Sequence, residues 1–229
     1  MDRVANFNLR MKVGAAAAIA LAAALLSAPA AADTISFDIT TGNAALGPFP
    51  GPYQSVTVDR TSPTTATITF DSLNNGTDIY LMGAVNAASV NVNAASWTMT
   101  ASGSNSLGGF TPGPFSDSGS GNVSAFGVFN QRVDSMAGFT HTSTEIVLML
   151  TDTSGSWANA GSVLVGNASG FDAATHTFVC ADPCTSLSSA IVTGFSAGSK
   201  GPSVPEPATL ALLGLGLAGI GFARRRRKI

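Results

Sequence analysis

The chain has 229 residues, of which 45% are hydrophobic and only 10% are charged. This length allows one domain of ordinary size together with sorting segments. The charges are segregated, because residues 33–203 contain eleven acidic and three basic residues, a balance of −8, while basic residues gather at both ends. An acidic middle argues against nucleic acid as a partner, since phosphate binding requires clustered lysine and arginine.

The N-terminal segment has the three parts of a secretory signal peptide. Basic residues precede an uninterrupted apolar run over residues 13–26, and an Ala-x-Ala pattern then ends at Ala32. Cleavage there makes Asp33 the first mature residue, with Ala30 as the alternative site. The rival interpretations are a buried alanine-rich helix and a permanent membrane anchor. We predict a signal helix and signal peptide over residues 1–32, and a mature protein that folds outside the cytoplasm.

Residues 33–196 are predicted to form a single all-β domain. Apolar and polar residues alternate with a period of two in many short stretches, including residues 34–40, 54–59 and 65–70. About ten or eleven such stretches with little helical periodicity indicate a β-sandwich or jelly-roll-like domain. The Asn-Asn-Gly at residues 74–76 is typical of a turn between adjacent antiparallel strands.

Two segments rich in glycine and serine are predicted to lack regular structure. We expect residues 101–121 to form a long loop within the one domain. The alternative, a connection between two domains, leaves only about five strands to each half. Residues 197–204 are expected to form a flexible spacer between the domain and the C-terminal tail.

Cys180 and Cys184 are the only cysteines. Two cysteines in an exported protein most simply form a disulfide. We interpret the pair as a clamp on a hairpin, whose small loop gives modest chain-entropy stabilisation. A metal or redox site is the less favoured alternative, because the spacing differs from Cys-x-x-Cys and there is no second pair. No metal site or cofactor is therefore predicted.

The residues suited to catalysis do not form a recognised motif. His141 and His176 are the only histidines, and Asp172 precedes His176 by four residues. A Ser-His-Asp set can be assembled only on paper, since the Gly-x-Ser-x-Gly turn of the hydrolases is absent. We interpret both histidines as surface or structural residues, and we predict that the protein is not an enzyme.

Oxygen-bearing side chains offer a weak calcium signal. Residues 71–78 are rich in such groups but lack the spacing of a calcium-binding EF-hand loop, so a hairpin turn is preferred. Calcium held between loops remains an open alternative. The scattered acids Asp117, Asp134, Asp152 and Asp172 are interpreted as solvated loop residues.

Four aromatic residues, Trp97, Trp157, Tyr53 and Tyr80, are suited either to sugar contacts, because aromatic rings stack on the apolar faces of sugars, or to the core of the sandwich. Trp97 alternates with Met99 along a predicted strand, which favours burial in the core. Trp157 follows a loop-like stretch, so we take Trp157 as the candidate sugar contact of a carbohydrate-binding module.

The C-terminal tail has three successive parts. Pro205, Glu206 and Pro207 give a stiff, extended peptide with one negative charge. Residues 209–223 are predicted to form a transmembrane helix of about 22 Å, shorter than a bilayer core of about 30 Å. The basic cluster that follows keeps the C-terminus in the cytoplasm by the positive-inside rule. This cluster is Arg224, Arg225, Arg226 and Arg227.

This tail resembles the PEP-CTERM sorting signal, and the resemblance covers only the end of the chain. It implies processing by exosortase, a membrane-embedded cysteine transpeptidase of Gram-negative bacteria. It also implies that residues 205–229 are the sorting signal, with Pro205, Glu206 and Pro207 as the recognition site and the arginine block as the stop-transfer cluster. Proteins with such tails are associated with extracellular polysaccharide. A plain single-pass tail anchor is the alternative interpretation.

Together these features predict an exported, non-enzymatic cell-surface or extracellular-matrix protein. It is expected to cross the inner membrane once before processing and then to reach the outer membrane or the extracellular space. Its expected partners are an exosortase-like enzyme, the inner membrane and extracellular polysaccharide. The alternative function is a carbohydrate-binding module for that polysaccharide.

Overall fold

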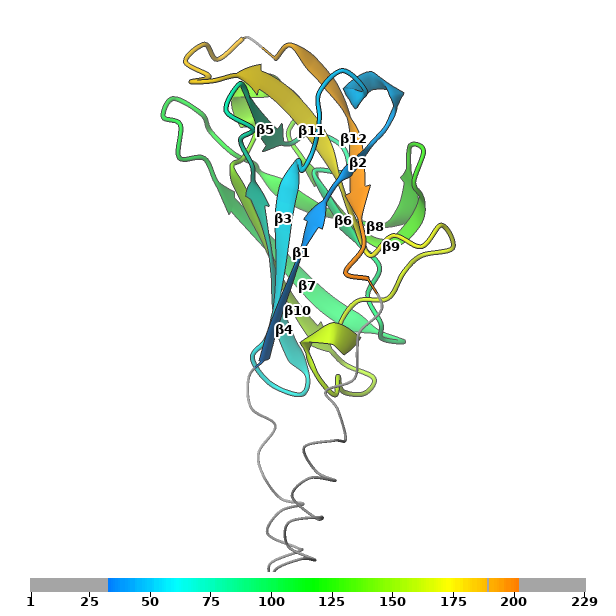
Figure 1. Ribbon diagram of the computed structural model, residues 1–229. Coiled ribbons are helices and arrows are strands. Elements are labelled where there is room, and N and C mark those ends of the chain that lie inside the picture. The colour runs from blue at the N-terminus through cyan, green and yellow to red at the C-terminus, as the bar shows by residue number, and fades with distance from the viewer. Residues whose placement is uncertain (1–32, 189, 202–229) are drawn as a thin grey trace, which may run out of the picture.

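A computed structural model describes residues 33–188 and 190–201. In these residues the chain forms two antiparallel sheets packed face to face (Figure 1). The all-β prediction is confirmed at this level. The predicted signal helix and the predicted transmembrane helix at 209–223 lie outside the described residues. Within the described residues, no helix is long and apolar enough to span a bilayer.

The first sheet has five strands in the order β1-β3-β4-β10-β7, and the second has seven in the order β2-β12-β11-β6-β9-β8 with β5 beside β11. The first comprises β1 (Asp33–Ile39), β3 (Gln54–Arg60), β4 (Thr65–Ser72), β7 (Trp97–Ser104) and β10 (Glu145–Asp152). The second comprises β2 (Thr41–Gly42), β5 (Asp78–Met82), β6 (Ala88–Val90), β8 (Phe115–Val123), β9 (Gly127–Ser135), β11 (Ala173–Ala181) and β12 (Val192–Gly198). Three short 3-10 helices are η1 (Ala44–Leu46), η2 (Phe139–His141) and η3 (Ala160–Ser162).

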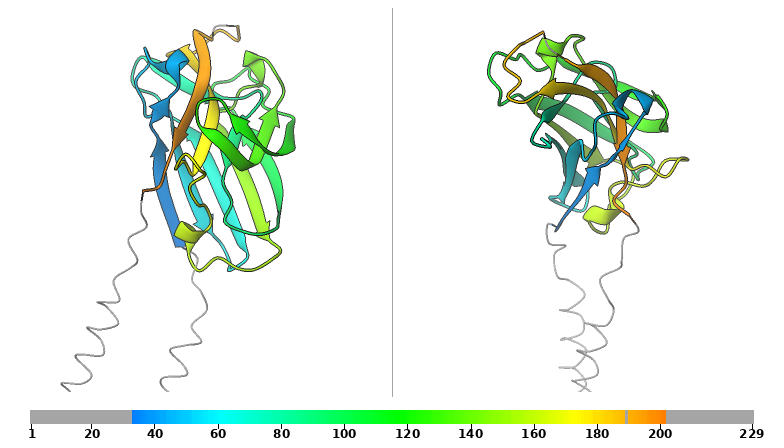
Figure 2. Two further views of the ribbon diagram at one scale, coloured as in Figure 1. Left: turned by 90° about the vertical axis from the view of Figure 1, so that its right-hand side faces the viewer. Right: turned by 45° about the horizontal axis from the view of Figure 1, so that its top comes forward.

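The main core lies between the two sheets. Figure 2 shows the two sheets from two further sides. On β3 and β4 buried residues, most of them apolar, alternate with threonines, serines and acids on the outer face, and on β10 the outer face also carries Val147 and Met149. This is the pattern expected of a sheet with one face on the core and one in water. The fully buried side chains contributed by these three strands include Val56, Val58, Ile68, Phe70, Ile146 and Leu148.

A polar network lies inside the core and joins the two sheets. The Gln54 amide on β3 donates to the carbonyl of Tyr80 and to Thr177 Oγ1, both at 3.2 Å. Its carbonyl oxygen accepts from Thr175 at 2.8 Å and from Ser196 at 3.1 Å. Nothing in the alternating pattern of these strands predicts the network, because the four side chains come together only when β3 packs on β11 and β12.

The turn at residues 74–76 does not join neighbouring strands of one sheet, so the hairpin prediction is wrong in this respect. β4 belongs to the first sheet, and β5, which follows the turn, pairs with β11 in the second. The chain does fold back locally, since Asn74 bridges Ile79. The Asn75 side chain accepts the backbone N–H groups of residues 77 and 78 at 2.9 and 2.8 Å. The turn is therefore the crossing point from one sheet to the other.

The long loop predicted over residues 101–121 is also wrong at both ends. β7 continues to Ser104, β8 begins at Phe115, and only residues 105–114 connect them. β8 pairs with β9 in spite of its glycines and serines, with two shifts of register. Arg132 on β9 lies against it and donates to the carbonyls of Ser118 and Gly119 at 3.0 and 3.4 Å. A Cβ at Gly121 would lie 2.4 Å from the Arg132 guanidinium carbon, so a larger residue there would displace the Arg132 side chain from its present position.

The folded part of the chain extends past residue 196, so the predicted boundary between domain and spacer is too early. Ala197 is fully buried and pairs with Thr41 and Ala174. Strand β12 ends at Gly198, and Lys200 is still held by the domain through its backbone N–H and its side chain. The two ends of the described chain, at Asp33 and Gly201, lie at the same end of the sandwich (Figure 1).

Candidate functional site

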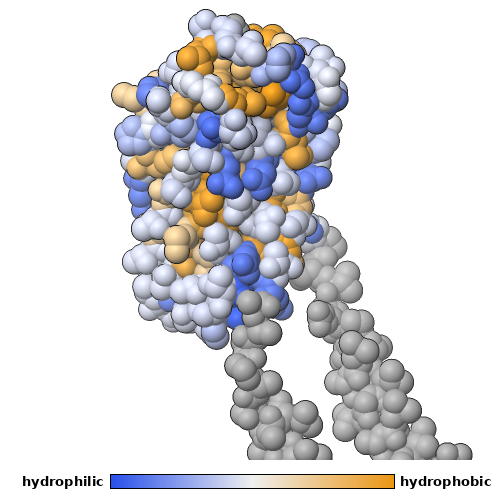
Figure 3. All heavy atoms as spheres, turned by 90° about the vertical axis from the view of Figure 1, so that its left-hand side faces the viewer, coloured by the Kyte–Doolittle hydropathy of each residue, from blue (hydrophilic) through white to orange (hydrophobic). Residues whose placement is uncertain are grey.

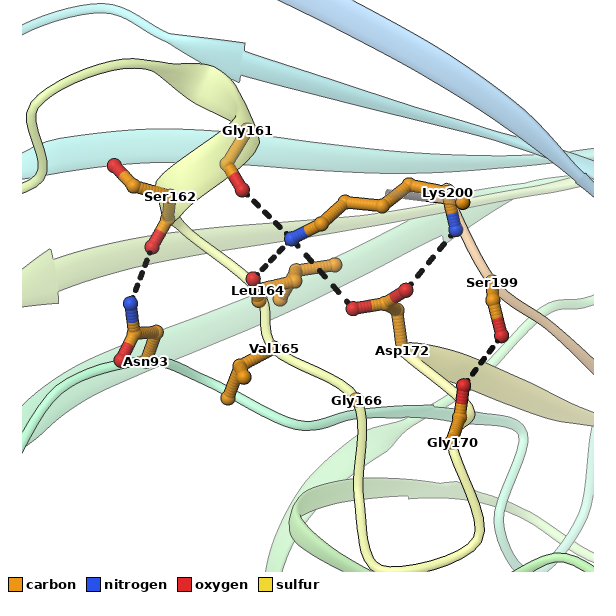
Figure 4. A pocket seen from close by; sticks show the side chains of 11 residues that line it. Asn93, Gly161, Ser162, Leu164, Val165, Gly166, Gly170, Asp172, Ser199 and Lys200 are labelled. Carbon is orange, nitrogen blue, oxygen red and sulfur yellow. Dashed lines mark hydrogen bonds and ion pairs between the residues drawn. The ribbon is translucent and has the colours of Figure 1, made fainter. Parts of the chain in front are cut away.

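A groove of about 540 Å³ lies beside the point where the described chain ends (Figure 4). It is bordered by the segment after η3, by the start of β11 and by the end of β12. The lining residues are Asn93, Gly161, Ser162, Leu164, Val165, Gly166, Gly170, Asp172, Ser199, Lys200 and Gly201. Sequence reasoning missed this site, because Asn93, residues 161–172 and residues 199–201 come from separate parts of the chain.

Lys200 is the central cation of the groove, and its side chain turns back onto the domain (Figure 4). Its Nζ lies 3.6 Å from Asp172 Oδ1 and donates to the carbonyls of Gly161, at 2.6 Å, and Leu164. Its backbone N–H donates to the second carboxylate oxygen of Asp172 at 3.0 Å. The side chains of Lys200 and Asp172 are only 14% and 5% exposed. The sequence interpretation of Asp172 as a solvated loop acid is therefore wrong, because its side chain is buried.

Helix η3 contacts both ends of the described chain. The backbone N–H of Ala160 donates to Asp33 Oδ2 at 2.7 Å, and the Gly161 carbonyl accepts from Lys200. Asp33 also binds Arg60, with 2.8 Å between Oδ1 and Nε. One short turn therefore ties the first strand and the last to the same corner of the domain.

Trp157 is not an exposed sugar contact, and that prediction is wrong. Its side chain is 3% exposed and belongs to the main core. The indole Nε1 donates to the Asn93 carbonyl at 2.8 Å, so the ring is fixed as well as buried. Trp97 is half-buried against the same core, on a strand as predicted, and its indole Nε1 donates to Gln131 Oε1 at 2.8 Å.

The two tyrosines are also core residues. Tyr53 and Tyr80 are 4% and 0% exposed, and their rings meet edge to face at 5.0 Å. Burial, with the nearby charge of Asp78, raises the pKa of Tyr80 to about 12. Its hydroxyl donates to the Pro50 carbonyl at 2.7 Å, so this phenol closes a loop onto the core.

The histidines lie on different elements, His141 in η2 and His176 in β11, and each has structural partners. His176 packs between Phe178 and Phe195, with ring centroids 4.7 and 4.5 Å away. Burial lowers the pKa of His176, and a hydrogen bond to the Val85 carbonyl offsets part of that change. The His141 ring contacts the Thr111 carbonyl, with Nδ1 2.8 Å from the oxygen. Asp172 is bound to Lys200, so it does not serve as a partner for His176.

The acidic residues do not converge on a common point in the described part of the chain, where no group of three histidine, cysteine or acidic residues is placed to hold a metal. Asp152, interpreted as solvated, is only 6% exposed. Its Oδ1 accepts the backbone N–H groups of Ser154 and Gly155 at 2.8 and 2.9 Å, and the first of these bonds is the main reason that its pKa is lowered. Asp134 and Asp117 likewise accept backbone N–H bonds from Asn86 and Gly119.

Cys180 and Cys184 form the predicted disulfide, with Cα atoms 5.5 Å apart. Cys180 lies in β11, and Cys184 lies in the connection from β11 to β12. Both belong to a second apolar cluster with Phe178, covered in part by Phe110 and Phe139. Hydrophobic surface gathers toward this end of the domain, away from the chain ends (Figure 3).

Comparison with protein families gives one match, to the PEP-CTERM protein-sorting motif over residues 203–228. The chain carries a PEP-CTERM sorting motif. The motif includes the three recognition residues predicted above, at 205–207, and the arginine block at 224–227. These residues lie outside the described part of the chain, as does the predicted signal peptide at 1–32. No curated protein and no solved structure matches the chain.

The PEP-CTERM motif begins two residues after the last described residue, Gly201. It implies an exported protein that is sorted by exosortase, a membrane enzyme. The groove around Lys200 is therefore the part of the folded domain nearest in sequence to the processing site.

Proposed function

We propose that this protein is a non-enzymatic structural or adhesive module of the cell surface or extracellular matrix. An exosortase-like enzyme separates its β domain from the membrane tail at Pro205, Glu206 and Pro207. The single observation that carries this proposal is the PEP-CTERM match at residues 203–228, immediately after a folded β-sandwich.

The contacts of the reactive side chains support a non-enzymatic role. The two cysteines are joined to each other, and His176 is packed between two phenylalanine rings. Asp172 is paired with Lys200, and Asp152 caps a turn. Each of these groups stabilises the fold, which leaves the sheet faces and loops as the surfaces for adhesion.

The topology of the described domain also supports membrane-proximal processing. Because both chain ends emerge at one end of the sandwich, the opposite end and the sheet faces point away from the attachment point (Figure 2). An inner-membrane stage with the arginine cluster in the cytoplasm gives this orientation.

The experiment is the intact mass of the protein recovered from cells with and without exosortase. With the enzyme, the recovered chain should start near Asp33 and lack the residues beyond about 205. Replacing residues 205–207 by alanine should leave the full tail in the inner-membrane fraction, and Pro202→Ala is the matched control outside the recognition tripeptide. Recovery of the arginine block on the mature protein in exosortase-containing cells contradicts the proposal.

The alternative function is binding of extracellular polysaccharide. Trp157, the contact residue predicted for it, is buried and cannot contact a sugar at the surface. A glycan array with the mature protein tests it directly. Specific binding that survives Trp157→Phe would favour the carbohydrate-binding function and would place its site elsewhere on the domain.

A further inference from the structure

The last described residues are held to the domain by what we call the tail clasp. The clasp consists of the Lys200–Asp172 ion pair together with the two carbonyls that accept from Lys200, those of Gly161 and Leu164. Ser199 adds a bond of 2.6 Å from its hydroxyl to the Gly170 carbonyl. Figure 4 shows the Lys200 side chain folded back across the groove, facing the domain.

The clasp removes the lysine charge from water, so it requires specific partners for that charge. Lys200 is one of three basic residues between 33 and 203, and its charge is largely removed from water. A buried ammonium group requires a counter-charge and hydrogen-bond acceptors, and loss of one partner leaves the other charge uncompensated. Asp172 and the two carbonyls supply all of these. An exposed end of a strand needs no such arrangement to terminate.

The clasp holds the chain to within a few residues of the sorting motif. Only residues 201–204 lie between Lys200 and Pro205. Five Cα steps span at most about 18 Å. Proteases cut exposed, extended chain far faster than chain that is hydrogen-bonded to a fold. A soluble protease therefore finds very little accessible chain at this junction while the clasp is closed.

We propose that the tail clasp guards the junction between the folded domain and the sorting motif. While the clasp is closed, soluble proteases cannot cleave the segment around Lys200. The domain therefore leaves the membrane only through cleavage at the motif itself. The inference rests on the proposed function, because it concerns the junction that sorting must cut. It adds a role for Lys200 and Asp172 in protecting that junction from other proteases.

Trypsin provides a direct test, because it cleaves after lysine and arginine and the domain offers it only Arg60, Arg132 and Lys200. The mature full chain in detergent is digested briefly, and the fragment ending at Lys200 is quantified by mass spectrometry. Asp172→Asn should accelerate cleavage after Lys200 at least about tenfold, while cleavage at the two arginines stays slow. Asp38→Asn, which removes an exposed acid from β1, is the matched control and should behave as the wild type.

The pattern of cleavage separates a local clasp from general unfolding. Equal rates for wild type and Asp172→Asn at Lys200 overturn the proposal. If Asp172→Asn is cut quickly at all three sites, Ser199→Ala decides, since it removes only the hydroxyl bond to Gly170. Selective acceleration at Lys200 in that variant supports the clasp, and unchanged cleavage refutes it.

Cells that lack exosortase test the guarding role independently of sorting. There the wild-type chain should remain attached to its tail, whereas Asp172→Asn should shed a domain cut between residues 198 and 205. A variant with a flexible glycine-serine insertion after Gly201 should also shed its domain, because the insertion adds protease-accessible chain and leaves the clasp intact. Absence of shedding from both variants overturns the guarding role. Failure of exosortase-containing cells to process the wild type refutes the proposed function instead.

Discussion

Replacing Gln54 with leucine should cost little stability, although Gln54 is fully buried and makes four hydrogen bonds. The hydroxyls of Thr175, Thr177 and Ser196 lie 2.8 to 3.1 Å from one another. Without Gln54 they can close a ring in which each donates once and accepts once. The Tyr80 carbonyl also keeps a donor, because Ser72 Oγ donates to it at 2.9 Å.

The magnitude follows from the number of polar groups left without partners. Leucine leaves none, so the free energy of unfolding should fall by only about 0–1 kcal/mol. Gln54→Asn, by contrast, buries an amide that is one methylene too short to reach across the sheets. With two polar groups unsatisfied at ~1–3 kcal/mol each, we expect a loss of about 2–6 kcal/mol.

Urea denaturation of the mature chain measures both variants, with the slope checked for constancy. In thermal unfolding the asparagine variant should melt roughly 4–24 °C lower, at about 2–4 °C per kcal/mol. The order of the two variants is the decisive result. A leucine variant less stable than the asparagine variant would refute the reasoning, because the hydroxyls would then depend on Gln54 itself.

Three further predictions concern charges and the disulfide. Asp71 faces Glu145 directly across β4 and β10, and burial together with that charge raises the pKa of Asp71. Because the raised pKa marks a destabilised carboxylate, Asp71→Asn should slightly raise the melting temperature at neutral pH, and the gain should vanish as the pH falls below that pKa; a gain that grows with acidity contradicts this. The lowered pKa of His176 gives stability the opposite dependence on pH. The neutral imidazole stabilises the fold above about pH 6.5, and that stability is lost as the pH falls through the folded-state pKa. His176→Phe should therefore lose less stability than the wild type between pH 7.5 and pH 5 in parallel urea titrations, and equal losses would rule this out. Replacing both Cys180 and Cys184 by alanine opens a loop with a sequence separation of only 4, which predicts a loss of about 2 kcal/mol in calorimetry, and a loss above ~4 kcal/mol would show that the disulfide does more than restrict the unfolded chain.

Local patterns along the chain were sufficient for the fold class and the covalent features. Alternation along residues 54–59 and 65–70 predicted strands, because side chains of a β-strand point to opposite faces whatever the partner strand is. Cys180 and Cys184 are close in sequence, so their bond needed no knowledge of the fold. The sorting motif is likewise read from consecutive residues, and the family comparison finds it at residues 203–228.

Only the tertiary structure decided which surfaces and partners these segments have. The glycine-rich β8 is a strand because Arg132 and β9 hold it, and Trp157 is buried because the core closes over its segment. The acid at 172 finds its counter-charge at Lys200, 28 residues away. Local sequence determines which way a side chain points relative to its own backbone. Burial and ion pairing depend instead on segments brought together from distant parts of the chain, and no pattern within one segment contains that information.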